Sequence, residues 1–377
     1  MAAGLGQPRA RRAARPGTGA APPPAMDLQV VAFEMDAAGD ASGVRTALAA
    51  LPLARLRQLA VVAKVEGTAT LNDASRELAS ACIRAELIRA GGQRLAAQSL
   101  EILSVGCEGV ISPGGWLFAS LDPVAPGRRG RKVRSAALPA GLVMGQARSA
   151  PVPMRDRAGP RHVEAAARAV RAAMREAGLS PASVALVLIK SPVLMPGTTI
   201  ALEADQRRHV GSTGASRGAA ALGAAMALGE IPRAPVDASR LCAEASLHGA
   251  RTLSFSGTET ERCEAVVFGH RPGGDPRLRA SLAVLEDLLD SRSLAALAGD
   301  PSTLRAVFFK AGIAAGGRLR GARTTVLSSE LPADKQLRAA ASGVVGAVLG
   351  TPRAFISGGA EHQAAPGACL AAVIRAV

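Results

Sequence analysis

Three short apolar runs along the chain each end in a lysine. A continuous apolar run of about four to eight residues is consistent with a strand that is buried on both faces. Each run is followed by a polar stretch with glycine and arginine, and then by a helical pattern rich in alanine and leucine. The recurrence of this order indicates an internal repeat. The runs cover residues 59–64, 184–190 and 305–310 and end at Lys64, Lys190 and Lys310.

A second short apolar run near the end of each repeat leads into a cluster of serine, glycine and glutamate. These clusters lie at residues 102–108, 253–259 and 355–361. Together with the lysine runs they predict three units of similar fold, joined by linkers rich in glycine, proline and arginine. The predicted units span residues 26–145, 150–272 and 278–377, with linkers at 121–135 and 270–277.

Helical segments lie between or after the strands. One begins after Asn72 and Asp73, which are residue types that cap helix N-termini, and it stops at Gly91. Another stops at Gly178. Because strand and helix alternate within each unit, the predicted fold class is α+β. The predicted helices cover residues 73–90, 162–177, 217–229 and 334–349.

The composition argues against several classes of protein. Aromatic residues make up 2% of the chain, too few for a surface that stacks single-stranded bases. The five cysteines are odd in number and show no CxxC spacing, which disfavours a disulfide framework or a zinc site and favours the cytoplasm. No apolar run approaches the roughly 20 residues of a membrane span, so we expect no membrane partner.

The formal net charge is +15. Four arginines lie within the first 26 residues and the others are scattered, which is typical of a solvated basic surface and not of a nucleic-acid-binding stripe. We therefore expect no nucleic-acid partner. Residues 1–25 lack the apolar core of a signal peptide. They are predicted to be a disordered basic tail or a misassigned start before Met26.

Lysine, serine and arginine recur together in the three units, and together they permit one kind of chemistry. Burial disfavours the charged form of a lysine, so a lysine on a buried strand can act as a neutral base. A serine followed by glycine can present its hydroxyl and leave main-chain N–H groups free for an oxyanion. The planar fork of arginine suits a ring carbonyl. The set can bind a polar planar ring and open one amide bond.

At these clusters the chain resembles the cyanuric acid hydrolase and barbiturase family of ring-opening amidohydrolases. The most specific motif is Ser357-Gly-Gly-Ala-Glu-His-Gln363, and the resemblance covers about residues 26–377. It implies three similar αβ domains around a pseudo-threefold axis, a central active site and a homotetramer. It implies a small planar cyclic amide as substrate, with cyanuric acid opened to carboxybiuret and biuret. Further similar stretches lie at residues 211–223, 227–230 and 317–323.

The resemblance also implies a Lys–Ser pair and an arginine from each unit, the second pair being catalytic. Lys190 follows the longest of the three apolar runs, which favours it as the base. Aligning the second cluster by its glutamate puts Phe255 at the nucleophile position, so a shift to Ser256, or to Ser254, is required. We expect Lys190 and Ser256 to be catalytic. The residues expected to bind substrate are Lys64, Arg76, Ser104, Val105, Arg217, Gly257, Lys310, Arg323, Ser357 and Gly358.

The resemblance further implies a structural magnesium or calcium ion beside the C-terminal loop, held in part by Ala360 and Gln363. The family's glutamate ligand after the third lysine stands here as Gly312, which argues against the ion. No cofactor is expected for the chemistry itself. His362, which has no second histidine near it in sequence, is interpreted as a structural residue.

Two alternatives stay open beside cyanuric acid hydrolysis. One is barbiturase activity on barbituric acid, since the sequence does not specify the ring. The other is a diverged protein that binds such rings without turnover. Phe255 and Gly312, two departures from the family pattern, motivate this second alternative. A third departure, Val105 in place of glycine, narrows one corner of the expected pocket.

Overall fold

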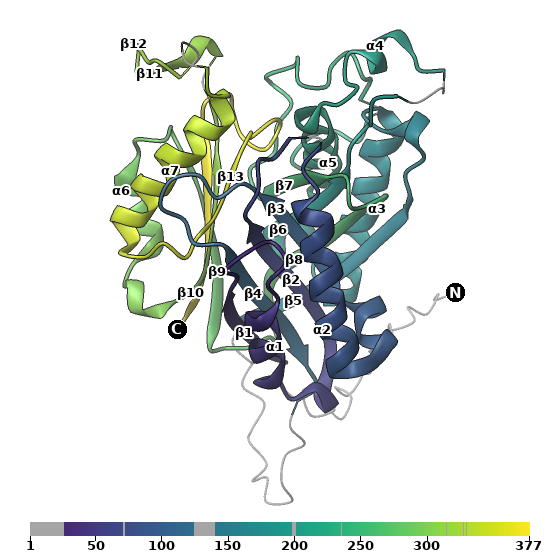
Figure 1. Cartoon of the computed structure of the whole chain (residues 1–377), viewed down its shortest axis with the longest axis vertical. Coiled ribbons are helices and arrows are strands. Elements are labelled where there is room, and N and C mark those ends of the chain that lie inside the picture. The colour runs from purple at the N-terminus through teal and green to yellow at the C-terminus, as the bar shows by residue number, and fades with distance from the viewer. Residues whose placement is uncertain are drawn as a thin grey trace, which may run out of the picture.

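Three four-stranded sheets with one shared connectivity form the frame of the molecule (Figure 1). The first contains β1 (Asp27–Glu34), β2 (Leu56–Val65), β3 (Leu100–Val105) and β4 (Gly114–Leu121). The second contains β5 (Ala140–Pro151), β6 (Val184–Pro192), β7 (Thr252–Gly257) and β8 (Arg262–Pro272). The third contains β9 (Leu278–Leu285), β10 (Leu304–Ala311), β13 (Phe355–Gly358) and β14 (Cys369–Ala376).

The strand orders are β1-β4-β2-β3, β5-β8-β6-β7 and β9-β14-β10-β13. The pairs β2–β3, β6–β7 and β10–β13 are parallel, and all other neighbouring strands within these sheets are antiparallel. The predicted α+β class and threefold repetition are therefore confirmed.

The structure describes residues 26–70, 72–123, 140–197, 201–234, 236–313, 315–326, 328 and 330–377. The expected tail 1–25 and most of the linker 121–135 therefore lie outside the described residues.

Helices follow the first and second strands of each sheet. They are α1 (Ser42–Ala49), α2 (Ser75–Gln98), α3 (Pro160–Ala177), α4 (Ala204–Arg207), α5 (Thr213–Leu228), α6 (Ser291–Ala298) and α7 (Ala333–Leu349). Single 3₁₀ turns lie at Leu53–Arg55, Met154–Asp156, Pro181–Ser183, Pro301–Thr303 and Ala315–Gly317, and a small ribbon of β11 (Arg318–Leu319) and β12 (Ala322–Arg323) is added in the third unit. No helix in the described part of the chain is long and apolar enough to cross a membrane.

The predicted helices are present, with differences at their ends. The helix predicted to stop at residue 90 breaks at Gly91 and Gly92 but then resumes as far as Gln98. The helix predicted from residue 217 begins at Thr213, because the side chain of Ser212 accepts a hydrogen bond from the N–H of Ala215 and caps the N-terminus.

The second sheet begins earlier than the predicted unit boundary at residue 150. β5 starts at Ala140 and pairs with β8 from its first residue. The apolar segment Leu142–Met144 is buried within β5. Its sequence is compatible with a strand but does not indicate which of the two sheets that strand joins. Residues 140–149 therefore belong to the second sheet.

A central core joins the three sheets. Alternate residues of β2, β6 and β10 enter one shared apolar cluster, for example Val62, Leu188 and Phe308. The residues between them pack toward the helices. Successive side chains of a strand point to opposite faces. The next residue on the central face of each strand is therefore one of the three lysines.

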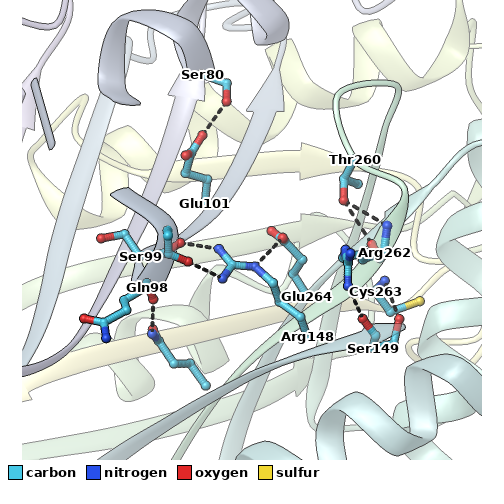
Figure 2. Close-up of polar contacts among 12 residues, drawn as sticks. Ser80, Gln98, Ser99, Glu101, Arg148, Ser149, Thr260, Arg262, Cys263 and Glu264 are labelled. Atoms are coloured by element: carbon cyan, nitrogen blue, oxygen red, sulfur yellow. Dashed lines mark hydrogen bonds and ion pairs between the residues drawn. The ribbon is translucent and has the colours of Figure 1, made fainter. Parts of the chain in front are cut away.

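Arg148 of β5 links the second unit to the first (Figure 2). Its Nε donates to Glu264 of β8 at 2.8 Å, and its terminal nitrogens donate to the main-chain oxygens of Ala97 and Ser99 at the end of α2. Gln146 adds a hydrogen bond from its side chain to the main-chain oxygen of Gln98 at 2.9 Å. This polar contact fixes β3, which carries the first serine cluster, beside the second sheet.

Candidate active site

The three lysines are among the most buried side chains of the protein. Lys64 and Lys190 are 1% exposed and Lys310 is 0% exposed, and all three lie at the ends of central strands. An ammonium group in such a position is stable only with close hydrogen-bond acceptors, and otherwise loses its proton. The hydrogen-bond partners of each amine therefore determine whether it is an ammonium group or a neutral base.

Two of the three lysines are paired with a serine hydroxyl. Lys64 is opposite Ser104 in the parallel register of β2 and β3, and its Nζ lies 3.2 Å from the serine Oγ. Lys310 is opposite Ser357 in β10 and β13, at 3.0 Å. The serines are 8% and 7% exposed, so they are the more accessible members of the two pairs. These Lys–Ser pairs lie where the sequence predicted them.

The second unit differs. β6 and β7 pair with Lys190 opposite Phe255, so the expected one-residue shift is not present. Strand alternation then places Ser254 and Ser256 on the face opposite Phe255. The hydroxyl of Ser254 donates to the main-chain oxygen of Arg217, and Lys190 reaches Ser256 only through its main-chain oxygen. The structure therefore does not bring the expected pair Lys190 and Ser256 together as amine and hydroxyl.

Lys190 has three acceptors around its amine. Nζ donates to the main-chain oxygens of Leu103 at 2.5 Å and Ser256 at 3.0 Å, and it forms an ion pair with Glu259 at 2.5 Å. Three acceptors require three N–H donors, which only the ammonium form supplies. Burial lowers the pKa of Lys190 to about 8, with Glu259 acting in the opposite direction, so the group is mainly protonated at neutral pH.

Three arginines lie near the start of the helices that follow the second strands, and each pairs with a glutamate of another unit. Arg76 of α2, Arg217 of α5 and Arg338 of α7 pair with Glu259, Glu361 and Glu108 at 3.3, 2.8 and 2.5 Å. Each glutamate stands four positions after the serine position of its cluster. The arginines are thus oriented by carboxylates, and the pairs close a cycle through the three units.

The arginine expected from the third unit, Arg323, is not part of this cycle. It lies exposed on β12 and donates to Ser328 at 2.8 Å. Arg338, 4% exposed, holds the position equivalent to Arg76 and Arg217. The structure therefore brings Arg338, and not Arg323, into this cycle, because what the three units share is an arginine on the helix that follows the second strand.

The other two lysine amines are in different electrostatic surroundings. Burial lowers the pKa of Lys64 to about 7, while Cys107 and Glu108 act to raise it. Burial, assisted by the charge of Arg217, lowers the pKa of Lys310 well below its usual range. Both amines can therefore be neutral near neutral pH, which a general base requires.

The remaining expected binding residues lie beside these groups. Val105 is 5% exposed, and its main-chain oxygen accepts from Lys64 at 3.2 Å. Gly257 is buried against Glu259, where an added Cβ would overlap the carboxylate. An added Cβ on Gly358 would lie 3.4 Å from Nη1 of Arg338. These positions shape the walls around the lysine and arginine groups.

The residues expected to hold a magnesium or calcium ion do not fit one. Gln363 is buried, its Oε1 accepts from the N–H of Ser254 at 2.8 Å, and its Nε2 donates to the oxygen of Gly359 at 3.1 Å. The main-chain oxygen of Ala360 accepts from the N–H of Gln363. At Gly312 any added side chain would overlap a main-chain oxygen, which excludes a carboxylate there. Among the described residues no group of three or more His, Cys, Asp or Glu is placed to bind a metal.

His362 has a structural role, as expected. Its Nε2 accepts from the N–H of Cys242 at 2.8 Å, and its Nδ1 contacts the main-chain oxygen of Leu247. Both ring nitrogens are therefore occupied by main-chain groups. The residue fastens the C-terminal loop to the second unit.

Three α+β units that direct buried lysines and paired arginines toward one centre define a repeat-built enzyme scaffold. The sequence matches the amidohydrolase ring-opening protein family over residues 29–376. It is 34% identical to a cyclic amide hydrolase of Azorhizobium caulinodans, over 93% of this chain and 100% of that protein. It is also 34% identical to a cyanuric acid amidohydrolase of Pseudonocardia dioxanivorans, over 82% of this chain and 87% of that protein.

The fold is shared with solved cyanuric acid hydrolases. One from A. caulinodans superposes with a TM-score of 0.79 at 30% identity, over 93% of this chain and 99% of that one. A second gives a TM-score of 0.81 at 26% identity, over 94% and 100%. The chain belongs to the ring-opening amidohydrolase family of the cyanuric acid hydrolase type. It is a hydrolase of cyclic amide C–N bonds.

Proposed function

We propose that the protein opens cyanuric acid, or a closely related cyclic imide, by transient transfer of a ring carbonyl to a serine activated by a neutral lysine. The observation that carries the proposal is the presence of two buried Lys–Ser pairs at 3.2 and 3.0 Å in one centre with three oriented arginines. Serine supplies the nucleophile, lysine the base, and the arginine forks hold the ring oxygens.

The reaction follows from these roles. The serine oxygen attacks a ring carbonyl carbon, and its proton passes to the lysine amine. The tetrahedral intermediate collapses, the ring C–N bond breaks, and the lysine returns the proton to the leaving nitrogen. Water then hydrolyses the serine ester and releases the linear product. With cyanuric acid that product is carboxybiuret, which loses carbon dioxide to give biuret.

Purified protein incubated with a panel of rings tests the proposal. The panel contains cyanuric acid, barbituric acid, hydantoin and a non-cyclic control such as biuret. We expect loss of one cyclic imide and appearance of its linear amide, measured by chromatography with mass detection. Thermal stabilisation by cyanuric acid or barbituric acid without turnover of any ring would refute hydrolysis of these substrates and support a binding role.

Barbituric acid is the second candidate substrate, and Phe255 favours it. Barbituric acid differs from cyanuric acid in having a methylene group in place of one ring N–H. The second unit presents an aromatic ring, 2% exposed, where the other two present serine hydroxyls. An apolar edge on the substrate suits that wall better than a polar one. The ratio of kcat/KM for the two rings discriminates between them.

A further inference from the structure

We propose that the third unit supplies the reacting groups: Ser357 is the nucleophile and Lys310 its base, an assignment that rests on the proposed ring-opening function. The second unit has a lysine but no hydroxyl in register with it, since Phe255 stands opposite Lys190. The nucleophile must therefore come from another unit. The structure leaves two pairs, Lys310–Ser357 and Lys64–Ser104.

The second unit is excluded on hydrogen-bond grounds as well. The amine of Lys190 is surrounded by two main-chain oxygens and the carboxylate of Glu259. As an ammonium it has no lone pair to receive a proton. Ser254 has its hydroxyl bonded to the main-chain oxygen of Arg217. Lys190 thus acts as a positioning residue, which ties β3 of the first unit to β7 of the second.

The partners of Lys310 suit a neutral amine. Its Nζ donates to the main-chain oxygen of Ser254 at 2.8 Å, which leaves the lone pair for the hydroxyl of Ser357 at 3.0 Å. The ring of Phe255 lies 4.9 Å from this nitrogen and covers one side of the amine, as the ring of Phe355 does for Lys64 at 5.7 Å. Phe255 therefore stands at the serine position of the second unit and also covers the amine of Lys310.

The charges around Ser357 favour the third unit over the first. An added Cβ on Gly359 would overlap Nη2 of Arg217, and one on Gly358 would lie 3.4 Å from Nη1 of Arg338, so two arginines border the loop that follows this serine. Arg217 uses Nε and Nη2 on Glu361, and its Nη1 has no hydrogen-bond partner among the described residues. That N–H group is available to a developing oxyanion.

The Lys64–Ser104 pair differs from the Lys310–Ser357 pair in the loop that follows its serine. Arg338 borders the loop after Ser104, where an added Cβ on Gly106 would lie 3.1 Å from its Nε. Val105 follows Ser104, whereas Gly358 follows Ser357, so access to the main chain is narrower. We assign Ser104 and Lys64 to binding a second ring carbonyl.

The chemical step is then specific. Ser357 Oγ forms a bond to the ring carbonyl carbon, the hydroxyl proton moves to Lys310 Nζ, and the electron pair of the breaking C–N bond stays with the ring nitrogen. Lys310 returns its proton to that nitrogen. Water later attacks the ester carbon, regenerates the Ser357 hydroxyl and completes hydrolysis.

Serine-to-alanine variants of the full chain test the assignment on whichever ring the wild type turns over. Ser357→Ala is expected to lower kcat by at least about 10⁴-fold, as loss of a nucleophile does. Ser104→Ala is expected to lower it by about 10²–10³-fold, as loss of one carbonyl donor does. Ser256→Ala should stay within about tenfold of wild type. Loss of turnover in Ser256→Ala, or near-normal turnover in Ser357→Ala, overturns the proposal.

A covalent readout on the wild type avoids dependence on variant folding. Acid quenching during steady-state turnover, followed by proteolysis and mass mapping, should place the ring-derived adduct on the peptide that contains Ser357. An adduct on Ser104, Ser254 or Ser256 overturns the assignment while leaving the ring-opening function intact. A wild type that consumes no ring in the panel refutes the proposed function itself, so the two failures are distinguishable.

Discussion

Position 255 determines what the second unit presents to the centre. The ring of Phe255 packs edge-on against Phe355 with centroids 4.9 Å apart, and it covers Lys310. Replacing a buried phenylalanine by a small residue costs about 3–5 kcal/mol. We expect Phe255→Ser to lower the free energy of unfolding by about this amount in urea titrations. The same variant should raise kcat/KM for cyanuric acid relative to barbituric acid, because a hydroxyl replaces an apolar wall.

Phe255→Leu is the matched control for this substitution. It keeps an apolar side chain at the position, so it should cost less than the serine variant and leave the ratio of kcat/KM values nearly unchanged. If the serine and leucine variants have the same stability and the same preference, the ring at position 255 neither packs nor selects as described.

The residue-scale features were only partly predictable. Lysine and serine recur in the same order in each unit, and the family resemblance implied the pairs Lys64–Ser104 and Lys310–Ser357. Strand alternation could also have excluded Ser256, because Leu253 and Phe255 alternate with Ser254 and Ser256, and a one-residue shift would turn the apolar pair away from the core. The resemblance to the family implied a serine at this position instead.

The helices after the second strands carry the three arginines, and this common placement defines their role. Arg338 lies in the second turn of α7, with Nε and Nη2 on Glu108 and Nη1 on Asp334. Arg323 lies on the added ribbon of β11 and β12, which has no counterpart among the described elements of the other two units. Sequence could have identified Arg338 from the similar surroundings of Arg217, since both precede an alanine-rich helical stretch.

Arginine-to-lysine substitutions test whether Arg338 or Arg323 is the substrate-binding arginine of the third unit. Arg338→Lys keeps a positive charge beside Glu108 but loses the planar fork. Loss of hydrogen bonds to a charged group costs about 1.5–3 kcal/mol, so we expect kcat/KM to fall by about 10–100-fold. Steady-state kinetics on the same ring give the measurement.

Arg323→Lys is the matched control and should stay within about twofold of wild type. A strong effect of Arg323→Lys with normal kinetics in Arg338→Lys would restore Arg323 as the substrate-binding residue. Thermal unfolding of both variants, run in parallel, shows whether a kinetic loss comes from a damaged fold.

At the scale of the whole molecule, the three units are joined by contacts that sequence does not reveal. Arg217 and Glu361 are 144 positions apart, and Arg338 and Glu108 are 230 apart. The repeat predicted that three units exist and which residues correspond, because local periodicity carries that information. It did not predict which glutamate meets which arginine, since that depends on how the sheets pack. The homotetramer implied by the family stays a prediction for light scattering.

These cross-unit ion pairs make stability depend on acid pH. Burial by itself raises the pKa of Glu361, but the charge and hydrogen bonds of Arg217 outweigh it and lower the pKa to about 2, from an ordinary value of 4.5. A carboxyl group with a depressed pKa stabilises the fold above pH 4.5, and that contribution is lost as pH falls from there toward 2. In full it amounts to about 3 kcal/mol.

Urea unfolding of wild type and Glu361→Gln between pH 7 and pH 3 measures this contribution. Wild type should be the more stable protein at pH 7, and the difference should narrow steadily below pH 4.5 as the Glu361 carboxylate takes up its proton. The exposed Glu286→Gln variant serves as control and should run parallel to wild type at every pH. A difference between wild type and Glu361→Gln that stays constant from pH 7 to pH 3 would show that the pair with Arg217 does not hold the second and third units together.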